Sequence, residues 1–386
     1  MDALYKTSLV ASGLCAIALL VALIAGAGAA VAGPLAVGFF ALLAVGVRVH
    51  PVLGDFTFTL AVFASVTFAM FYPGVLDTVG GFELTLLIVP LIQIIMFGMG
   101  ASLSVEDFAG VMKMPKGVLV GLVCQFSIMP LVGLSLATVF GFSNEIAAGV
   151  VLIGSAPSGV ASNVMAYIAG ANLALSVTLT AVATLLAPVM TPFLMEMLAG
   201  QFVPIDFVEM MWSIIEMVIV PVVLGLLFNR YFHGKAQWLD DIMPVISMTA
   251  ITVIIAIITA AGRDDLLAIG ALLVAAAIVH NAAGYVFGYW GCRLLGMDET
   301  DCRTISIEVG MQNGGLASGI AMEMGKVATV GLAPAVFGPW MNITGSGLAN
   351  WWRRQMLEEE GAAAGAAPGA APERAEGTAS TSPEVT

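Results

Sequence analysis

The stretch "GSAPSGVASNVMAYIAG" (residues 154–170) decides how this chain folds, because it interrupts an apolar run that is long enough to cross a membrane. It contains a proline, three serines and an asparagine. A second stretch, "SIEVGMQNGGLASGIAMEMG" (306–325), interrupts a later run and adds a carboxylate, Glu308. Unpaired backbone groups are costly in hydrocarbon, so irregular backbone persists there only inside protein or along a water-filled cavity. The two stretches therefore predict two broken helices that line a polar site.

The composition indicates a polytopic membrane protein. Of 386 residues, 60% are hydrophobic and 10% are charged, and the mean hydropathy is +1.01, whereas soluble domains average about 25% charged residues. Nothing in the sequence predicts nucleic-acid binding. The cysteines lack the spacing of a metal site or a disulfide framework, so we expect reduced thiols. They are Cys15, Cys124, Cys292 and Cys302.

The apolar runs divide the chain into four regions. A membrane-spanning helix needs about 20 apolar residues, and ten suitable runs lie between residues 56 and 352. The predicted regions are an N-terminal hydrophobic extension of one or two helices (1–55), a first five-helix repeat (56–200), a second five-helix repeat (201–352) and an acidic tail (353–386). The tail is rich in Ala, Gly and Pro and is expected to be disordered.

The cationic residues predict the orientation, because short cytoplasmic loops collect Lys and Arg. If the first of the ten spans begins on the cytoplasmic side, the inner loops hold eight cationic residues. The outer loops then hold two, Arg263 and Lys326. The inner residues are Lys113, Lys116, Arg230, Lys235, Arg293, Arg303, Arg353 and Arg354. This bias predicts a cytoplasmic C-terminus. We expect an integral membrane protein of a bacterial inner (plasma) membrane.

Two matches at one spacing indicate an internal duplication. The segment "GVASNVMA", which begins at Gly159, resembles "GLASGIAM", which begins at Gly315, at an offset of 156 residues. At the same offset Gln125 corresponds to Asn281. Each half holds an odd number of spans, so the halves insert with opposite orientation. Inverted repeats with paired interrupted helices are typical of secondary transporters.

The two breaks offer groups that suit a cation and an anion together. A half-helix that ends in the membrane presents carbonyls to a cation, and one that begins there presents amides to an anion. Pro157 ends the first half-helix, and Gly310, Gly314 and Gly315 interrupt the second. A Gly-rich packing kink without a ligand is the alternative for either break taken alone.

Glu308 lies near the middle of a span, where a charge costs about 2.5–3.5 kcal/mol on insertion scales. It therefore needs a partner, a proton or a cation, and hard cations prefer oxygen ligands. Ser176 and Thr180 share one helical face by their i, i+4 spacing, and Ser162 and Asn163 open a half-helix. Each hydroxyl alone would bond to its own helix backbone, but the set around Glu308 predicts a sodium site.

Four motifs together resemble the bile acid:sodium symporter family over about residues 56–352. They are "CQFSIMP" (124–130), "GVASNVMAYIAGANLALSVTLT" (159–180), "LLAPVMTP" (185–192) and "IEVGMQN" (307–313). The resemblance implies an all-α polytopic membrane protein with a ten-helix inverted-repeat (5+5) core, divided into panel and core domains, and two crossing broken helices. It also implies a symporter, not an enzyme, that couples uptake of a small organic anion to two sodium ions.

By position, the resemblance implies two sodium sites that share Glu308. The first site consists of Ser162, Asn163, Ser176, Thr180 and Glu308. The second consists of Gln125, Glu308 and Gln312 with the backbone carbonyls of Val309 and Met311. The groups implied for the carboxylate of the substrate are Gly159, Val160, Asn313 and Asn342.

The substrate side departs from the family pattern at three positions. Ser158 replaces a glycine, Val160 stands where bacterial members often have a threonine, and Met341 stands where a histidine is often found. The resemblance therefore favours a small keto- or hydroxy-acid, as in bacterial and plastid relatives, over a bile acid.

Two other functions remain open on the sequence. A cation/proton antiporter-like transporter would share crossed broken helices, but antiporters often place an Asp pair at the crossing, whereas Gln312 and Asn313 follow a lone Glu308 here. A membrane receptor or scaffold that has lost transport is the second, and the intact set of polar residues in the spans argues against it. An intramembrane hydrolase would need a catalytic pair, and the three histidines are scattered.

Overall fold

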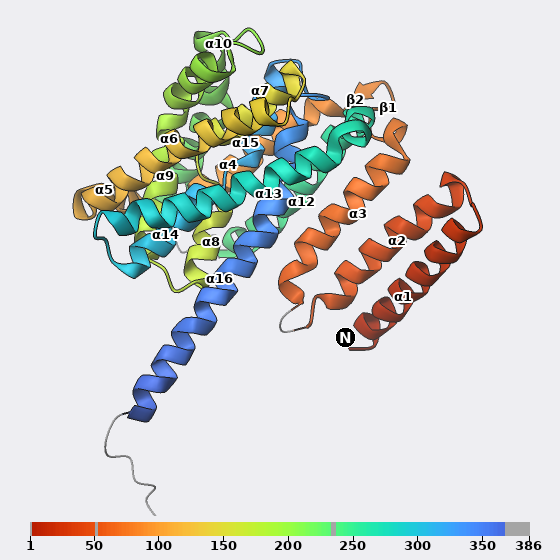
Figure 1. The fold of residues 1–386 in the computed structure, drawn as a ribbon, viewed down its shortest axis with the longest axis horizontal. Helices are drawn as coiled ribbons and strands as arrows, with labels where there is room; N and C mark the ends of the chain where they lie inside the picture. The colour runs from red at the N-terminus through yellow and green to blue at the C-terminus, as the bar shows by residue number, and fades with distance from the viewer. Residues whose placement is uncertain (1, 51–52, 233–236, 367–386) are drawn as a thin grey trace, which may run out of the picture.

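The computed structural model describes residues 2–50, 53–232 and 237–366, and the described chain is almost entirely helical (Figure 1). Eight of the described helices are long and apolar enough to cross a membrane. Because so many apolar spans follow one another, the chain is a polytopic integral membrane protein. Figure 1 shows the helices in one layered bundle, from which the last helix extends.

The first part of the chain contains ten α-helices and one short hairpin. In order these are α1 (Asp2–Ile24), α2 (Ala29–Val47), α3 (Thr57–Phe71), the strands β1 (Thr78–Val79) and β2 (Phe82–Glu83), α4 (Ile88–Ser102), α5 (Val105–Lys113), α6 (Pro115–Val139), α7 (Asn144–Ser155), α8 (Ala161–Ile168), α9 (Leu173–Leu194) and α10 (Phe207–Ile214). Single turns precede α3 (Gly54–Phe56), β1 (Pro73–Val75) and α4 (Leu84–Leu87). The strands pair antiparallel, with Thr78 opposite Glu83.

The second part is helical throughout. Its elements are α11 (Val220–Phe232), α12 (Gln237–Ala261), α13 (Arg263–Leu294), α14 (Glu299–Gly310), α15 (Gly314–Glu323) and α16 (Leu332–Ala366). Two π-helical turns, Met195–Ala199 and Ile215–Ile219, extend α9 and join α10 to α11. The segment from Phe207 to Phe232 is therefore one span.

Two helices are broken at the predicted places, and their linkers pair with each other. α7 ends at Ser155 and α8 begins at Ala161, while α14 ends at Gly310 and α15 begins at Gly314. The Gly159 amide donates to the Met311 carbonyl at 2.9 Å, and the Asn313 amide donates to the Pro157 carbonyl at 2.8 Å. These bonds form an antiparallel bridge between Ser158 and Gln312. Each linker thus provides hydrogen-bond partners for the other at membrane depth.

The helices pack in two groups. α4 contacts α11 and α12, and α12 contacts α3, whereas α6 contacts α7, α13 and α14, and α16 contacts α7, α13 and α14. Glycines permit the closest approaches in the second group, because a Cβ atom on Gly284 of α13 would lie 2.7 Å from the Cα atom of Gly310 at the end of α14. This approach brings α13 side chains within reach of the second linker.

The two N-terminal helices lie beside α3 at one edge of the bundle (Figure 1). α1 packs on α2, and α2 packs on α3. The Ser12 hydroxyl of α1 donates to the Phe39 carbonyl of α2 at 3.0 Å. Many apolar side chains of α1, including Leu14 and Ile24, are exposed, which suits a helix that faces lipid.

Two segments differ from the expected ones, and two helices are short. The segment after Ser104, which lies between two of the predicted spans, forms α5, because Ser104 and Asp107 build a capping box at its start. α3 and α7 are shorter than a full span. Finally, α16 continues to Ala366, so residues 353–366 of the predicted disordered tail are helical. Good helix formers, including Leu357 and Glu358, extend the preceding span. Residues 367–386 lie outside the described residues.

Candidate functional site

Glu308 is the centre of a buried cluster of oxygen atoms. Its side chain is 2% exposed. The Ser162 hydroxyl donates to Glu308 Oε1 at 2.6 Å, and the Ser176 hydroxyl donates to the same oxygen. The Thr180 hydroxyl donates to Oε2 at 2.8 Å. Asn163 closes the cluster, since its Oδ1 lies 2.9 Å from Ser176 Oγ and 3.1 Å from Thr180 Oγ1.

Three separate helices bring these residues together. Glu308 lies in the last turn of α14, Ser162 and Asn163 lie in the first turn of α8, and Ser176 and Thr180 lie one turn apart on α9. The i, i+4 spacing on α9 directs both hydroxyls to one side. The structure therefore gathers all five residues of the first predicted sodium site.

The cluster contains more oxygen contacts than its protons can satisfy. Each of the three hydroxyls has a single proton. Ser176 and Thr180 each contact both Glu308 and Asn163, and Ser162 contacts Glu308 and, at 2.7 Å, the Gly159 carbonyl. Three protons cannot serve six contacts at once. Such a surplus of oxygen lone pairs around a carboxylate suits a hard cation, which binds oxygens without needing a donor.

The second predicted site is gathered only in part. The Gln125 amide nitrogen donates to the Ala156 carbonyl at 2.8 Å and also contacts Gln312 Oε1. The side-chain nitrogen of Gln312, Nε2, donates to the Val309 carbonyl at 2.6 Å. The Met311 carbonyl accepts the Gly159 amide in the linker bridge, and the Glu308 carboxylate accepts its hydrogen bonds from Ser162, Ser176 and Thr180 of the first cluster. Gln125 Oε1 is buried and has no hydrogen-bond partner among the described residues.

The predicted substrate groups are less free than expected. The Gly159 amide is engaged by Met311, and the Asn342 side chain donates to the Gly338 carbonyl one turn back at 3.1 Å. Val160 precedes the first residue of α8. Asn313 Oδ1 caps α15 through the Leu316 amide at 3.0 Å. The Asn313 side-chain nitrogen is buried without a partner in the described part of the chain, so it is one donor that is available to a ligand.

Sequence reasoning missed two groups near the site. The Ser158 hydroxyl, at the position noted as a departure from glycine, also interacts with Glu308. Asn281, found only as the repeat counterpart of Gln125, donates its side-chain nitrogen to the Gly310 carbonyl at 2.8 Å and accepts a hydrogen bond from Thr344. A polar residue at the repeat-equivalent position was the available signal for Asn281.

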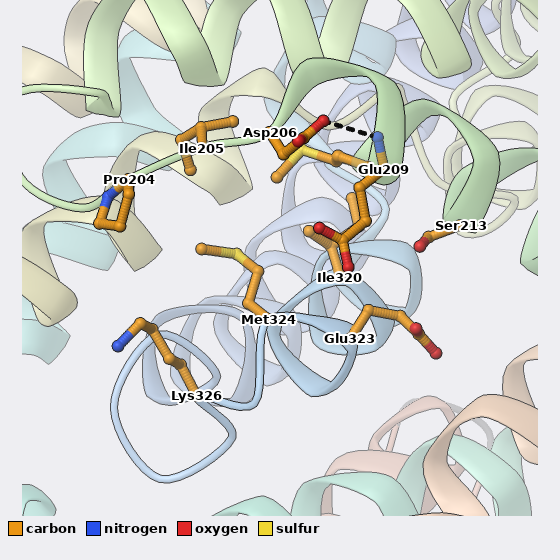
Figure 2. Close-up of a pocket in the computed structure, with 10 residues that line it drawn as sticks. Pro204, Ile205, Asp206, Glu209, Ser213, Ile320, Glu323, Met324 and Lys326 are labelled. Carbon is orange, nitrogen blue, oxygen red and sulfur yellow. Dashed lines mark hydrogen bonds between the residues drawn. The ribbon is translucent and has the colours of Figure 1, made fainter.

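A separate cavity of about 520 Å³ lies between α10 and the end of α15 (Figure 2). Its lining includes the carboxylates of Glu209 and Glu323 and the ammonium of Lys326. Lys326 pairs with Glu145 at the start of α7, and the Thr329 hydroxyl donates to the same carboxylate at 2.6 Å. Through the Lys326–Glu145 pair, the lining of the cavity contacts the start of α7.

Comparisons with known proteins find several relatives of this chain. Residues 89–269 match the model of the Sodium Bile acid symporter family. The chain is 38% identical over 268 residues to the uncharacterized sodium-dependent transporter YocS of Bacillus subtilis, covering 69% of this chain and 83% of that protein. It is 35% identical to the probable chloroplastic sodium/metabolite cotransporter BASS1 of Arabidopsis thaliana, covering 68% and 66%. It is 32% identical to the ileal sodium/bile acid cotransporter of Oryctolagus cuniculus, covering 60% and 67%.

Proposed function

Because the chain belongs to the sodium bile acid symporter family, whose members are sodium-coupled transporters and not enzymes, we propose that it carries a small organic anion into the cell together with two sodium ions. The observation that carries this proposal is the buried Glu308 carboxylate, which is surrounded by hydroxyl and amide oxygens from three helices. Sodium is here a transported substrate, bound and released in every cycle.

The first ion binds within the Glu308 cluster. Glu308 supplies the negative charge that offsets the cost of removing sodium from water, and Ser162, Asn163, Ser176 and Thr180 supply neutral oxygens. With sodium bound, each hydroxyl turns its lone pairs to the ion and its proton to a neighbouring carbonyl or amide oxygen. Because the oxygens come from α8, α9 and α14, the ion ties these helices together.

The second ion binds between the two linkers. Its ligands are Gln125, Glu308, Gln312 and the carbonyls of Val309 and Met311. Two observations support this assignment: Gln125 and Gln312 touch each other, and Gln125 Oε1 is buried without a partner in the described ranges. A buried acceptor of this kind costs about 1–3 kcal/mol unless something binds it.

The anion binds on the other side of the linkers. α8 and α15 both begin there, and the N-terminus of a helix favours a carboxylate. The Val160 amide, the unpartnered nitrogen of Asn313 and the Asn342 side chain are the proposed donors, with Gly159 shaping the linker. Space exists at this level, because a Cβ atom on Gly338 of α16 would meet nothing within 4 Å. A small keto- or hydroxy-acid fits these few donors.

The ten spans built from α3 to α16 form two inverted repeats, and the two packing groups act as panel and core. The panel contains α3, α4 and α10 to α12, and the core contains the crossing. Both repeats fix the end of a half-helix in one way: Gln125 bonds to Ala156, and Asn281 bonds to Gly310, each at 2.8 Å. Movement of the core against the panel provides alternating access.

The C-terminus faces the cytoplasm of a bacterial cell and the protein lies in its inner membrane. Lys116 donates to the Leu295 carbonyl at 2.8 Å, and Arg303 lies 5.9 Å from the ring of Trp352. These contacts link two of the predicted inner residues to neighbouring segments, and the cationic bias of the inner loops supports this orientation under the positive-inside rule. Two sodium ions and one monovalent anion import one net charge, which gains about 2.3 kcal/mol per 100 mV of membrane potential.

Proteoliposomes test this function directly. With an inward sodium gradient, the addition of a transported carboxylate should make the lumen positive, as reported by a potential-sensitive dye, and replacing sodium by potassium should abolish the signal. A panel of small keto- and hydroxy-acids identifies the anion. A signal that follows a proton gradient in the absence of sodium would instead favour an antiporter-like function.

A further inference from the structure

The ends of the two half-helices are held in equivalent ways by the long helix that precedes each. Gln125 of α6 donates to the carbonyl of Ala156 after α7, and Asn281 of α13 donates to the carbonyl of Gly310 at the end of α14. Both amide side chains are buried, at 3% and 1% exposure. The last carbonyls of a helix lack partners within the helix, so each amide satisfies a group that hydrocarbon would leave unpaired.

The two amides differ in what their oxygen atoms meet. Gln125 Oε1 has no partner among the described residues. Asn281 Oδ1, in contrast, accepts a hydrogen bond from the Thr344 hydroxyl of α16 at 2.5 Å, which is the nearest of three acceptors around that hydroxyl. The Tyr285 hydroxyl lies 3.3 Å from Thr344 Oγ1. A chain of polar contacts thus runs from Tyr285 through Thr344 and Asn281 to Gly310.

We propose that Asn281 and Thr344 are positioning residues for the second sodium ion. This proposal rests on the proposed function. At the end of α7, sodium is the partner of the Gln125 side-chain oxygen; at the end of α14, the Thr344 hydroxyl is the partner of the Asn281 side-chain oxygen. The protein therefore builds one ion site between the linkers instead of two equivalent ones. Thr344 orients Asn281, and Asn281 fixes the Gly310 carbonyl.

The Gly310 carbonyl matters because it lies between two proposed ligands. The carbonyls of Val309 and Met311 belong to the neighbouring peptide groups, so a rotation at Gly310 turns both away from the ion. Close packing keeps the chain of contacts in register. A Cβ atom on Gly345 of α16 would lie 2.7 Å from the Met311 sulfur and 3.2 Å from the Tyr285 hydroxyl. Outer partners that orient metal ligands typically change metal affinity about 10- to 100-fold when they are lost.

Thermal unfolding of the purified full-length protein tests the proposal, because it needs no substrate. Sodium chloride is titrated against potassium chloride at constant ionic strength, and the sodium concentration at half-maximal stabilisation is measured. In Thr344→Val this midpoint should rise about tenfold, and Thr344→Ser, which keeps the hydroxyl, should stay near wild type. Tyr285→Phe, a milder change at the far end of the chain, should raise the midpoint less.

Thr249→Val is the matched control, because Thr249 makes the same backbone bond one turn back, to Val245 at 2.8 Å, on an exposed face of α12. A Thr344→Val protein that is less stable in both salts but keeps the wild-type sodium midpoint would overturn the positioning role and leave the proposed function intact. If Thr344→Val does not fold, an unchanged midpoint in Tyr285→Phe would overturn it. A wild-type protein without sodium-specific stabilisation would overturn the proposed function and this inference with it.

Discussion

Replacing Glu308 with glutamine should abolish sodium-specific stabilisation while leaving the protein folded. The carboxylate is 2% exposed and is the only charge among the five residues of the first cluster. A sodium ion about 2.5 Å from a carboxylate oxygen gains about 7 kcal/mol at an effective dielectric constant of 20. Loss of that attraction corresponds to roughly four to five orders of magnitude in sodium affinity, at about 1.4 kcal/mol per tenfold change.

The assay compares melting temperatures in sodium and potassium chloride. At a sodium concentration 100-fold above its Kd, binding stabilises the wild-type protein by about 2.7 kcal/mol, which is a rise in Tm of roughly 3 °C for a chain of this length. The Glu308→Gln protein should show no rise. In potassium chloride it should be at least as stable as wild type, because an amide costs less to bury than a carboxylate.

Glu323→Gln provides the control, because Glu323 lies exposed at the end of α15 and should leave the sodium effect unchanged. The reasoning fails if Glu308→Gln keeps the wild-type difference between the two salts. It also fails if the mutant is strongly destabilised in potassium, since the carboxylate would then be a structural partner of Ser162, Ser176 and Thr180.

Three further changes test separate parts of the structure. Thr180→Val keeps the side-chain shape but removes an oxygen from the cluster. It should lower the affinity for sodium about tenfold, since hydrogen bonds to charged groups contribute about 1.5–3 kcal/mol. Gly154→Ala places a Cβ atom 2.4 Å from the Met129 carbonyl and should lower stability by about 1–3 kcal/mol, whereas Gly338→Ala, with nothing within 4 Å, should leave Tm unchanged or slightly higher. Asn172→Ala removes both the cap on α9 at Leu175 and the bond to Asp301 of α14, and it should cost about 1–2 kcal/mol in a melt.

The sequence was sufficient for the parts of the site that depend on local spacing. The two interruptions predicted the breaks that the structure shows between α7 and α8 and between α14 and α15. The hydroxyls of Ser176 and Thr180 fall on one face because they are one turn apart. The charge of Glu308 in an apolar span predicted that these hydroxyls gather around it, and the structure brings the groups together.

Contacts between distant helices could not be predicted in the same way. Thr344 and Asn281 are 63 residues apart, and Lys326 and Glu145 are 181 residues apart, so each pairing depends on how whole helices sit against one another. The engagement of the Gly159 amide by Met311 likewise depends on the register of the two linkers. The helix α5, in contrast, could have been predicted from the sequence, because Ser104 and Asp107 have the spacing of a capping box.

The backbone bridge between the two linkers has a consequence for how this transporter can change during evolution. Residues 157–159 contribute to the face proposed for the anion, and residues 311–313 contribute ligands proposed for the ion, yet the two segments are hydrogen-bonded to each other. An insertion or a deletion in either linker would break the pairing of both. New substrates are therefore expected to arise by substitution of side chains while the lengths of the linkers stay fixed. Each substitution at the anion face is also expected to change the affinity for sodium.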